Sequence, residues 1–237
     1  PFATIEPNTA LAAVPDPRLD QLSQLYHNAP IKPATVTFVD IAGLVKGAAD
    51  GEGLGNKFLA NIRECNAIVH VVRAFTDPNV QHVDATADPA RDISVINTEL
   101  ILADLATVDK HLPKLEKESR ANPKLRPEVE LLQQIRARLD AGEPAGENIS
   151  DLQLLTAKPV IYLFNVDESG LSDTALKARL TDLVTPSPAL FVCAQLEAEL
   201  SALDPAEAAE LLESYGQTES GLVQLIHAAY GALGLQS

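Results

Sequence analysis

The sequence contains no methionine and has little aromatic character. Its 237 residues include only 4% aromatics, although 46% are hydrophobic. We therefore expect an aliphatic core built from Leu, Val, Ile and Ala. An aliphatic protein of this length ordinarily has several methionines. Their absence and the abrupt start at Pro1 indicate part of a longer protein.

Cysteines and long apolar runs are also scarce. Cys65 and Cys193 are the only cysteines and lie far apart, so we expect reduced core residues rather than a disulfide or a metal site. No run of about 18 apolar residues is present, and no signal peptide is recognisable. These absences predict a soluble, cytoplasmic protein with no membrane partner.

Positive charge is scarce and unevenly placed. The formal net charge is −15, which makes general attraction to nucleic acid, DNA included, unfavourable. No Lys or Arg follows Arg179, yet eight of them accompany four Glu between Lys110 and Arg138. This basic segment is either a contact surface for nucleic acid or the ribosome, or a solvated helix face.

Short apolar runs alternate with helical patterns along most of the chain. Nearly continuous apolar strands are typical of a parallel sheet that is buried on both faces. The expected strands are 11–14, 35–39, 67–73, 159–165 and 189–193. The expected helices are one that starts within 15–20, and 56–66, 176–183, 205–214 and 219–233. The pattern predicts an α/β fold with ligand chemistry at the carboxyl ends of the strands.

The segment between Ile93 and Leu139 has a different pattern. Leucines and valines recur at helical spacing on both sides of a polar, proline-containing break at 119–127. Two amphipathic helices joined by such a turn form an antiparallel helical hairpin. Because the α/β pattern resumes afterwards, we predict a nucleotide-binding domain in two parts, 1–92 and 151–237, with an inserted hairpin at 93–150.

The apolar run that begins at Val36 ends in Asp40, and Gly43 opens a glycine-rich loop. In nucleoside triphosphatases such an Asp holds Mg²⁺, usually through water, and such a glycine amide senses the γ-phosphate. The pattern D-x-x-G is short and common, so a strand followed by a flexible loop is the alternative. Thr4 is either a hydroxyl ligand of Mg²⁺ in a switch loop or part of an extended arm.

Candidate contacts for a base follow two later strands. Asn165 would brace the loop backbone, and Glu168 would bind the edge of a base. Cys193, Ala194 and Gln195, after the next strand, would lie behind that base. The order and spacing of these elements resemble those of translation-factor GTPases.

The guanine-specific pattern N-K-x-D is altered in this chain. Val166 replaces its lysine and Glu168 replaces its aspartate. The aspartate of that pattern accepts two N–H bonds from guanine. A longer carboxylate and a lost lysine weaken guanine selection, so adenine becomes a credible base.

Several long runs resemble the YchF family of Obg-like ATPases across essentially the whole chain: 1–8, 15–20, 38–47, 51–56, 61–63, 70–73 and 96–100. The resemblance implies a Ras-like P-loop NTPase fold, a parallel sheet with an inserted antiparallel α-helical hairpin. It also implies hydrolysis of ATP, with GTP as a poorer alternative, and association with the ribosome, with Lys110–Arg138 as the candidate contact.

The resemblance also points to a catalytic group. Leu44 stands where Ras-like enzymes carry a glutamine that orients water, and an aliphatic side chain cannot do this. The family's candidate is a histidine in a loop, and His82 matches it. A solvated loop histidine is the alternative for His82.

Two parts of the family pattern are missing. The phosphate-binding loop G-x-x-x-x-G-K-[ST], expected before Pro1, is absent, as is the ubiquitin-like domain expected after Ser237. We therefore expect weak or no nucleotide binding, and no turnover, from these residues alone. A non-catalytic ribosome-binding or protein-binding module with a regulatory nucleotide site, and a guanine-specific GTPase, are the alternative functions.

Overall fold

The computed structural model describes residues 8–41, 54–75, 87–147, 149 and 152–235. Its contacts divide the chain into two compact units. The first comprises 1–8, 40–66 and 91–158, and the second comprises 9–39, 67–90 and 159–237. Each is described by itself below. The division into domains at residues 92 and 150 stays a prediction.

The second unit is built on a parallel sheet in the order β3-β4-β5. Its strands are β3 (Ile68–Arg73), β4 (Val160–Asn165) and β5 (Ala189–Val192). The parallel sheet predicted from the apolar runs is thereby confirmed. β1 (Asn8–Ala13) and β2 (Thr35–Asp40) pair as a separate two-stranded sheet, so the expectation that the runs 11–14 and 35–39 belong to the parallel sheet was wrong.

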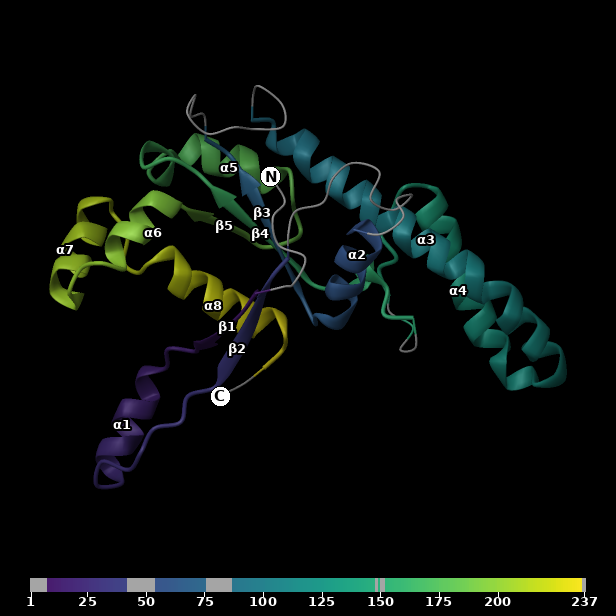
Figure 1. The fold of residues 1–237 in the computed structure, drawn as a ribbon, viewed down its shortest axis with the longest axis horizontal. Helices are drawn as coiled ribbons and strands as arrows, with labels where there is room; N and C mark the ends of the chain where they lie inside the picture. The colour runs from purple at the N-terminus through teal and green to yellow at the C-terminus, as the bar shows by residue number, and fades with distance from the viewer. Residues whose placement is uncertain (1–7, 42–53, 76–86, 148, 150–151, 236–237) are drawn as a thin grey trace. The chain divides into compact units, whose positions relative to one another are not determined.

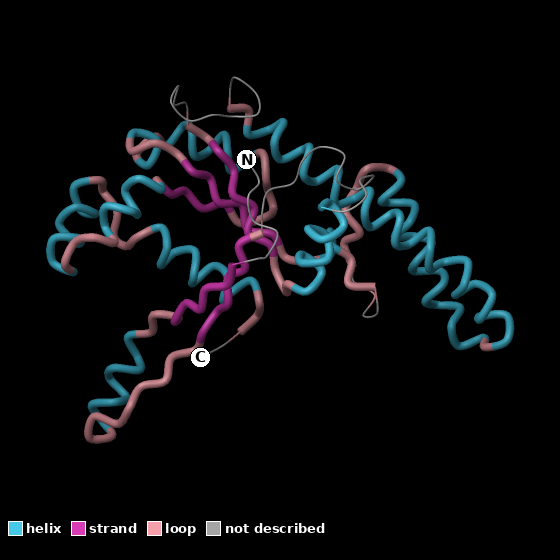
Figure 2. Tube along the Cα trace, viewed as in Figure 1, coloured by secondary structure: helices cyan, strands magenta, loops and turns pink. Residues whose placement is uncertain are grey.

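Helices cover both faces of the parallel sheet, as Figure 2 shows. On one face, Ile161 packs in a core cluster with Ile226 of α8 (Gly221–Ala232). On the other, the Lys177 ammonium of α5 (Thr174–Asp182) lies 5.6 Å from the Phe191 ring centroid. Successive residues of a strand face opposite sides, so apolar residues throughout β4 serve both layers.

The remaining helices of this unit begin at side-chain caps or strand ends. Asp16 accepts from the amide of Arg18 at the start of α1 (Pro17–Leu25). Asp204 and Glu207 form a capping box on α7 (Pro205–Ser214). α6 (Ala194–Leu200) follows β5 directly, and the short 3₁₀ helix η3 (Ser169–Leu171) follows β4. The sequence pattern had not predicted α6.

The first unit contains α2 (Leu54–Glu64) and the predicted helical hairpin (Figure 1). Its long helices are α3 (Pro89–Ala121) and α4 (Arg126–Asp140), with the 3₁₀ turn η1 (Pro123–Leu125) between them. Gln133 Nε2 donates to Glu116 Oε1 at 2.8 Å, and Arg136 Nε donates to Asp109 Oδ1 at 2.6 Å. Numbers rise along one helix as they fall along the other, which confirms the antiparallel pairing.

The hairpin is held by an aliphatic seam and by one buried carboxylate. Val108, Leu132, Ile135 and Leu139 are all at most 2% exposed. Asp104, which is fully buried, accepts hydrogen bonds from the backbone at η2 (Leu155–Ala157). None of the helices in the described ranges is both long and apolar enough to cross a membrane.

Candidate nucleotide-base site at the carboxyl edge of the sheet

The three parallel strands end together. Arg73 pairs with Asn165, and Asn165 pairs with Val192. The amide of Val166 continues the ladder by donating to the Val192 carbonyl at 2.8 Å. The segments after β4 and β5 therefore emerge at one edge, which is where ligands bind in open α/β sheets.

Asn165 joins these two segments. Its side-chain oxygen accepts a hydrogen bond from the amide of Ala194, the first residue of α6, at 3.1 Å. Asn165 is half-buried, whereas Ala194 is exposed. The amide side chain thus binds loop backbone, as the sequence pattern indicated, and its contact with a nucleotide stays a prediction.

Val166 and Cys193, two of the residues predicted to contact the base, are buried beneath this edge of the sheet. Val166 is 2% exposed and Cys193 is 4% exposed, so their side chains belong to the core. Both could support a base only from beneath or through their backbone. Gln195 is exposed, and its amide nitrogen lies 3.5 Å from Glu199 Oε1.

The two carboxylates after β4 have different surroundings. Asp167 accepts from the Ser169 hydroxyl at 2.7 Å and from the Gly170 amide at 2.8 Å, and these bonds hold the pKa of its carboxyl below the usual value. Asp167 is therefore used in the turn at η3. Glu168 is half-buried, and its carboxylate accepts a hydrogen bond from a residue outside this turn.

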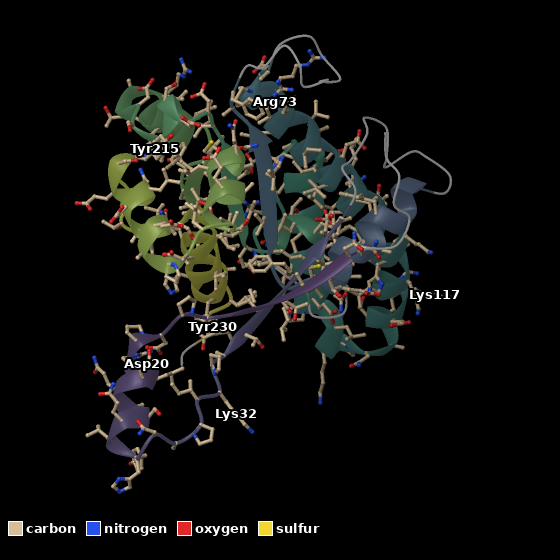
Figure 3. All side chains as sticks on the ribbon, turned by 60° about the vertical axis from the view of Figure 1, so that its left-hand side comes forward. Asp20, Lys32, Arg73, Lys117, Tyr215 and Tyr230 are labelled. Carbon is tan, nitrogen blue, oxygen red and sulfur yellow. The ribbon has the colours of Figure 1, made fainter. Side chains whose placement is uncertain are left out.

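That partner is Tyr215, which directly follows α7 and is labelled in Figure 3. Its hydroxyl donates to Glu168 Oε2 at 2.9 Å, and this bond raises the pKa of Tyr215. The two residues are 47 positions apart, and no sequence pattern had linked them.

Arg73 also lies at this edge of the sheet. In the sequence it stands out only as part of the run 70–73, which predicts no role for it. It ends β3, donates to the Phe75 carbonyl at 3.2 Å and lies 4.6 Å over the Phe75 ring. A cation at the carboxyl end of a buried strand was a signal that could have identified this position.

The predicted phosphate side is described only in part. Asp40 is the exposed last residue of β2 and belongs to the first unit. Thr4, Gly43, Leu44 and His82 lie outside the described residues. Within the described ranges, no group of three or more His, Cys, Asp or Glu could hold a metal ion.

Comparisons with known proteins define the class. Residues 1–99 match the family model described as 50S ribosome-binding GTPase. The structure of the Schizosaccharomyces pombe YchF GTPase is similar, with a TM-score of 0.79 and 35% identity, over 98% of this chain and 67% of that one. The fold is therefore that of a P-loop NTPase with a Ras-like parallel sheet, as the sequence predicted.

Curated relatives identify the family. The chain is 42% identical over 250 residues to the ribosome-binding ATPase YchF of Escherichia coli O157:H7, covering 100% of this chain and 69% of the relative. It is 41% identical to the protein of the same name in Bacillus subtilis (strain 168), covering 99% and 68%. The chain belongs to the YchF family, which confirms the resemblance found in its motifs.

Proposed function

We propose that the protein is a Mg²⁺-dependent nucleoside triphosphatase that prefers ATP, accepts GTP, and acts as a ribosome-associated switch in the cytoplasm. The carrying observation is the carboxyl edge of the sheet, where Asn165 joins the two segments expected to hold the base. The names of its relatives, ribosome-binding ATPases, support the same activity and partner.

In this proposal the base lies over the floor formed by Val166 and Cys193. Asn165 keeps the two loops at a fixed separation through the amide of Ala194, and Glu168 accepts a hydrogen bond from the base edge. A preformed loop reduces the ordering cost of binding, so affinity should depend on the brace as well as on groups that touch the base.

The phosphate side follows the sensor-loop pattern. The Asp40 carboxylate and the Thr4 hydroxyl offer oxygen ligands of the kind that Mg²⁺ prefers, and Asp40 is exposed at its strand end. When bound, Mg²⁺ neutralises developing charge on the phosphates. The Gly43 amide would contact the γ-phosphate, and His82 would orient the attacking water, since Leu44 cannot.

The role of His82 has a direct test in the full-length protein, including any residues before Pro1 and after Ser237. His82→Ala should lower kcat about a hundredfold while the Kd for ATP changes little, because a group that orients the attacking water acts mainly in the transition state. His27→Ala, at an exposed position of the described chain, is the control. Equal losses in kcat and affinity would assign His82 a structural role.

A second test uses residues 1–237 alone, which contain no phosphate-binding loop of the pattern G-x-x-x-x-G-K-[ST]. That loop supplies backbone amides and a lysine to the phosphates. Residues 1–237 alone should therefore bind ATP weakly or not at all in a titration. Micromolar affinity without the loop would contradict this part of the proposal.

A second candidate function is a ribosome-binding or protein-binding module whose nucleotide site is only regulatory. It is favoured by exposed cations along the hairpin, including Lys114, Lys117, Arg120 and Lys124. Figure 3 shows the Lys117 side chain on this hairpin. Exposed cations that are free to approach phosphates provide salt-dependent affinity for RNA.

Charge reversal separates binding from hydrolysis. Lys117→Glu with Lys124→Glu should abolish co-sedimentation with ribosomes and leave ATP hydrolysis unchanged. Lys32→Glu with Arg179→Glu, also at exposed positions, changes the net charge equally and is the matched control. If both pairs weaken co-sedimentation equally, the hairpin is not the contact. Absence of hydrolysis in the full-length wild-type protein would favour the non-catalytic module.

A further inference from the structure

The hydrogen bond from Tyr215 occupies one of the two carboxylate oxygens of Glu168 at the proposed base site. The Tyr215 hydroxyl donates to Glu168 Oε2 at 2.9 Å. Among the residues that the structure describes, none donates to the other oxygen, Oε1. The two oxygens of the carboxylate that would meet the base are thus unequal.

Tyr215 is held in place by the end of α7. Its amide donates to the Leu212 carbonyl at 3.1 Å, and the amide of Gln217 donates to the same carbonyl at 2.9 Å. Gly216 between them has φ +67°, a conformation that glycine adopts without strain. The tyrosine therefore sits at a defined helix terminus rather than on a free loop.

The two purines make different demands on a carboxylate. Guanine presents two neighbouring N–H donors on its pairing edge, and a carboxylate binds them best with both oxygens in parallel. Adenine presents one amino group beside a ring nitrogen that accepts, so a single oxygen suffices. A donor already bound to Oε2 weakens that oxygen as an acceptor and removes the advantage of guanine.

We propose that Tyr215 is a specificity-determining residue that positions Glu168 and engages Oε2, so that Oε1 reads one amino group and the site favours adenine over guanine. The inference rests on the proposed function, because it requires Glu168 to meet the base. It adds to the altered N-x-x-E pattern a residue from the end of α7, a helix that no sequence motif had connected with the nucleotide.

Tyr215→Phe in the full-length protein tests this role, because it removes only the hydroxyl. Competition of ATP and GTP for one fluorescent-nucleotide site gives both Kd values. The ATP preference should fall about tenfold, mainly through tighter GTP binding, since one charged hydrogen bond to guanine becomes available. Tyr26→Phe, at a side chain that is 70% exposed, should leave both Kd values unchanged.

A double-mutant cycle separates two possible roles of Tyr215: positioning the Glu168 carboxylate, or only tethering α7 to the loop. In a Glu168→Ala background, Tyr215→Phe should have no further effect on the ratio of the two Kd values. If Tyr215 were only a tether between α7 and the loop, its loss would weaken ATP and GTP equally in the wild-type background. That result, or an unchanged ratio, would overturn the inference.

The same measurements distinguish failure of the inference from failure of the proposed function. If Glu168→Ala alters the ratio and Tyr215→Phe does not, only the role of Tyr215 is wrong. If Glu168→Ala leaves both Kd values unchanged, the carboxylate does not read the base, and both statements fail. If each variant alters the ratio, and the hydroxyl has no effect once the carboxylate is gone, both statements are supported.

Discussion

The side chain of Asn165 and the backbone of Ala194 are joined by a hydrogen bond of 3.1 Å, which ties the end of β4 to the start of α6. Because Asn165 also pairs with Val192 within the sheet, the segments that follow β4 and β5 diverge from a common point. The separation of these segments is therefore set by the protein before any ligand arrives.

Asn165→Ala should weaken ATP and GTP binding by a similar factor, about tenfold, because the brace acts before the base is distinguished. The free energy of unfolding should fall by about 1 kcal/mol. Isothermal titration and urea unfolding measure the two effects.

Asn122→Ala is the matched control for that variant. Asn122 Oδ1 accepts from the amide of Lys124 at 3.3 Å, so the change again removes one side-chain bond to backbone. It should leave nucleotide affinity unchanged. A fall in affinity for only one nucleotide in Asn165→Ala would contradict the bracing role.

Asp104 supports the hairpin through three hydrogen bonds. It accepts from the amides of Leu155 and Thr156 at 2.8 Å each and from the Thr156 hydroxyl at 2.7 Å. Burial raises the pKa of its carboxyl, while these donors and nearby Arg63 act in the opposite direction. The carboxylate thus closes the connection between α3 and the segment that follows α4.

Asp104→Asn should lower the free energy of unfolding by about 2 kcal/mol, because the amide has only one oxygen and places N–H donors against a backbone N–H. Asp109→Asn, in an exposed ion pair with Arg136, should cost less than about 1 kcal/mol. Urea unfolding of both variants provides the comparison. Equal costs would show that the buried network contributes no more than a surface ion pair.

The burial of His70 predicts that stability depends on pH. The sequence pattern predicted a packed histidine, and its ring lies 5.3 Å from that of Tyr162. Burial lowers the pKa of His70 to about 4, from 6.5. Between these values the unfolded chain takes up a proton that the folded chain does not, so stability is lost as pH falls through this window.

The wild-type protein should therefore lose about 2 kcal/mol from this group between about pH 7 and pH 5. His70→Gln should remove that part of the pH dependence, whereas His27→Gln, at an exposed position, should retain it. Urea unfolding at the two pH values measures both slopes. An unchanged slope in His70→Gln would mean that the imidazole is not held neutral.

Short-range sequence patterns predicted most helices and strands but not the contacts between segments that are far apart in the sequence. The apolar runs ending at Asn165 and near Cys193 identified β4 and β5, because β4 is buried along most of its length and β5 is apolar throughout although only Val192 in it is fully buried. α6 was missed because its seven residues are too few for a helical period to stand out. The pairing of β1 with β2 depends on tertiary contacts that composition does not encode.

The candidate site shows the same limit. Asn165 was predicted because it is a polar residue at the end of a buried strand, and Glu168 because it follows three residues later in an altered N-K-x-D pattern. Tyr215 was not, because its bond to Glu168 joins residues 47 positions apart through the placement of α7. The proposed role of Tyr215 depends on the direction of its side chain, which sequence spacing alone does not provide.

The most direct test of the central claim is competition between ATP and GTP for one site in the full-length wild-type protein, repeated with Glu168→Ala. The account predicts one shared site, tighter binding of ATP, and a changed ratio when the carboxylate is removed. Tight GTP binding with no ATP binding, or a ratio that Glu168→Ala leaves unaltered, would contradict it.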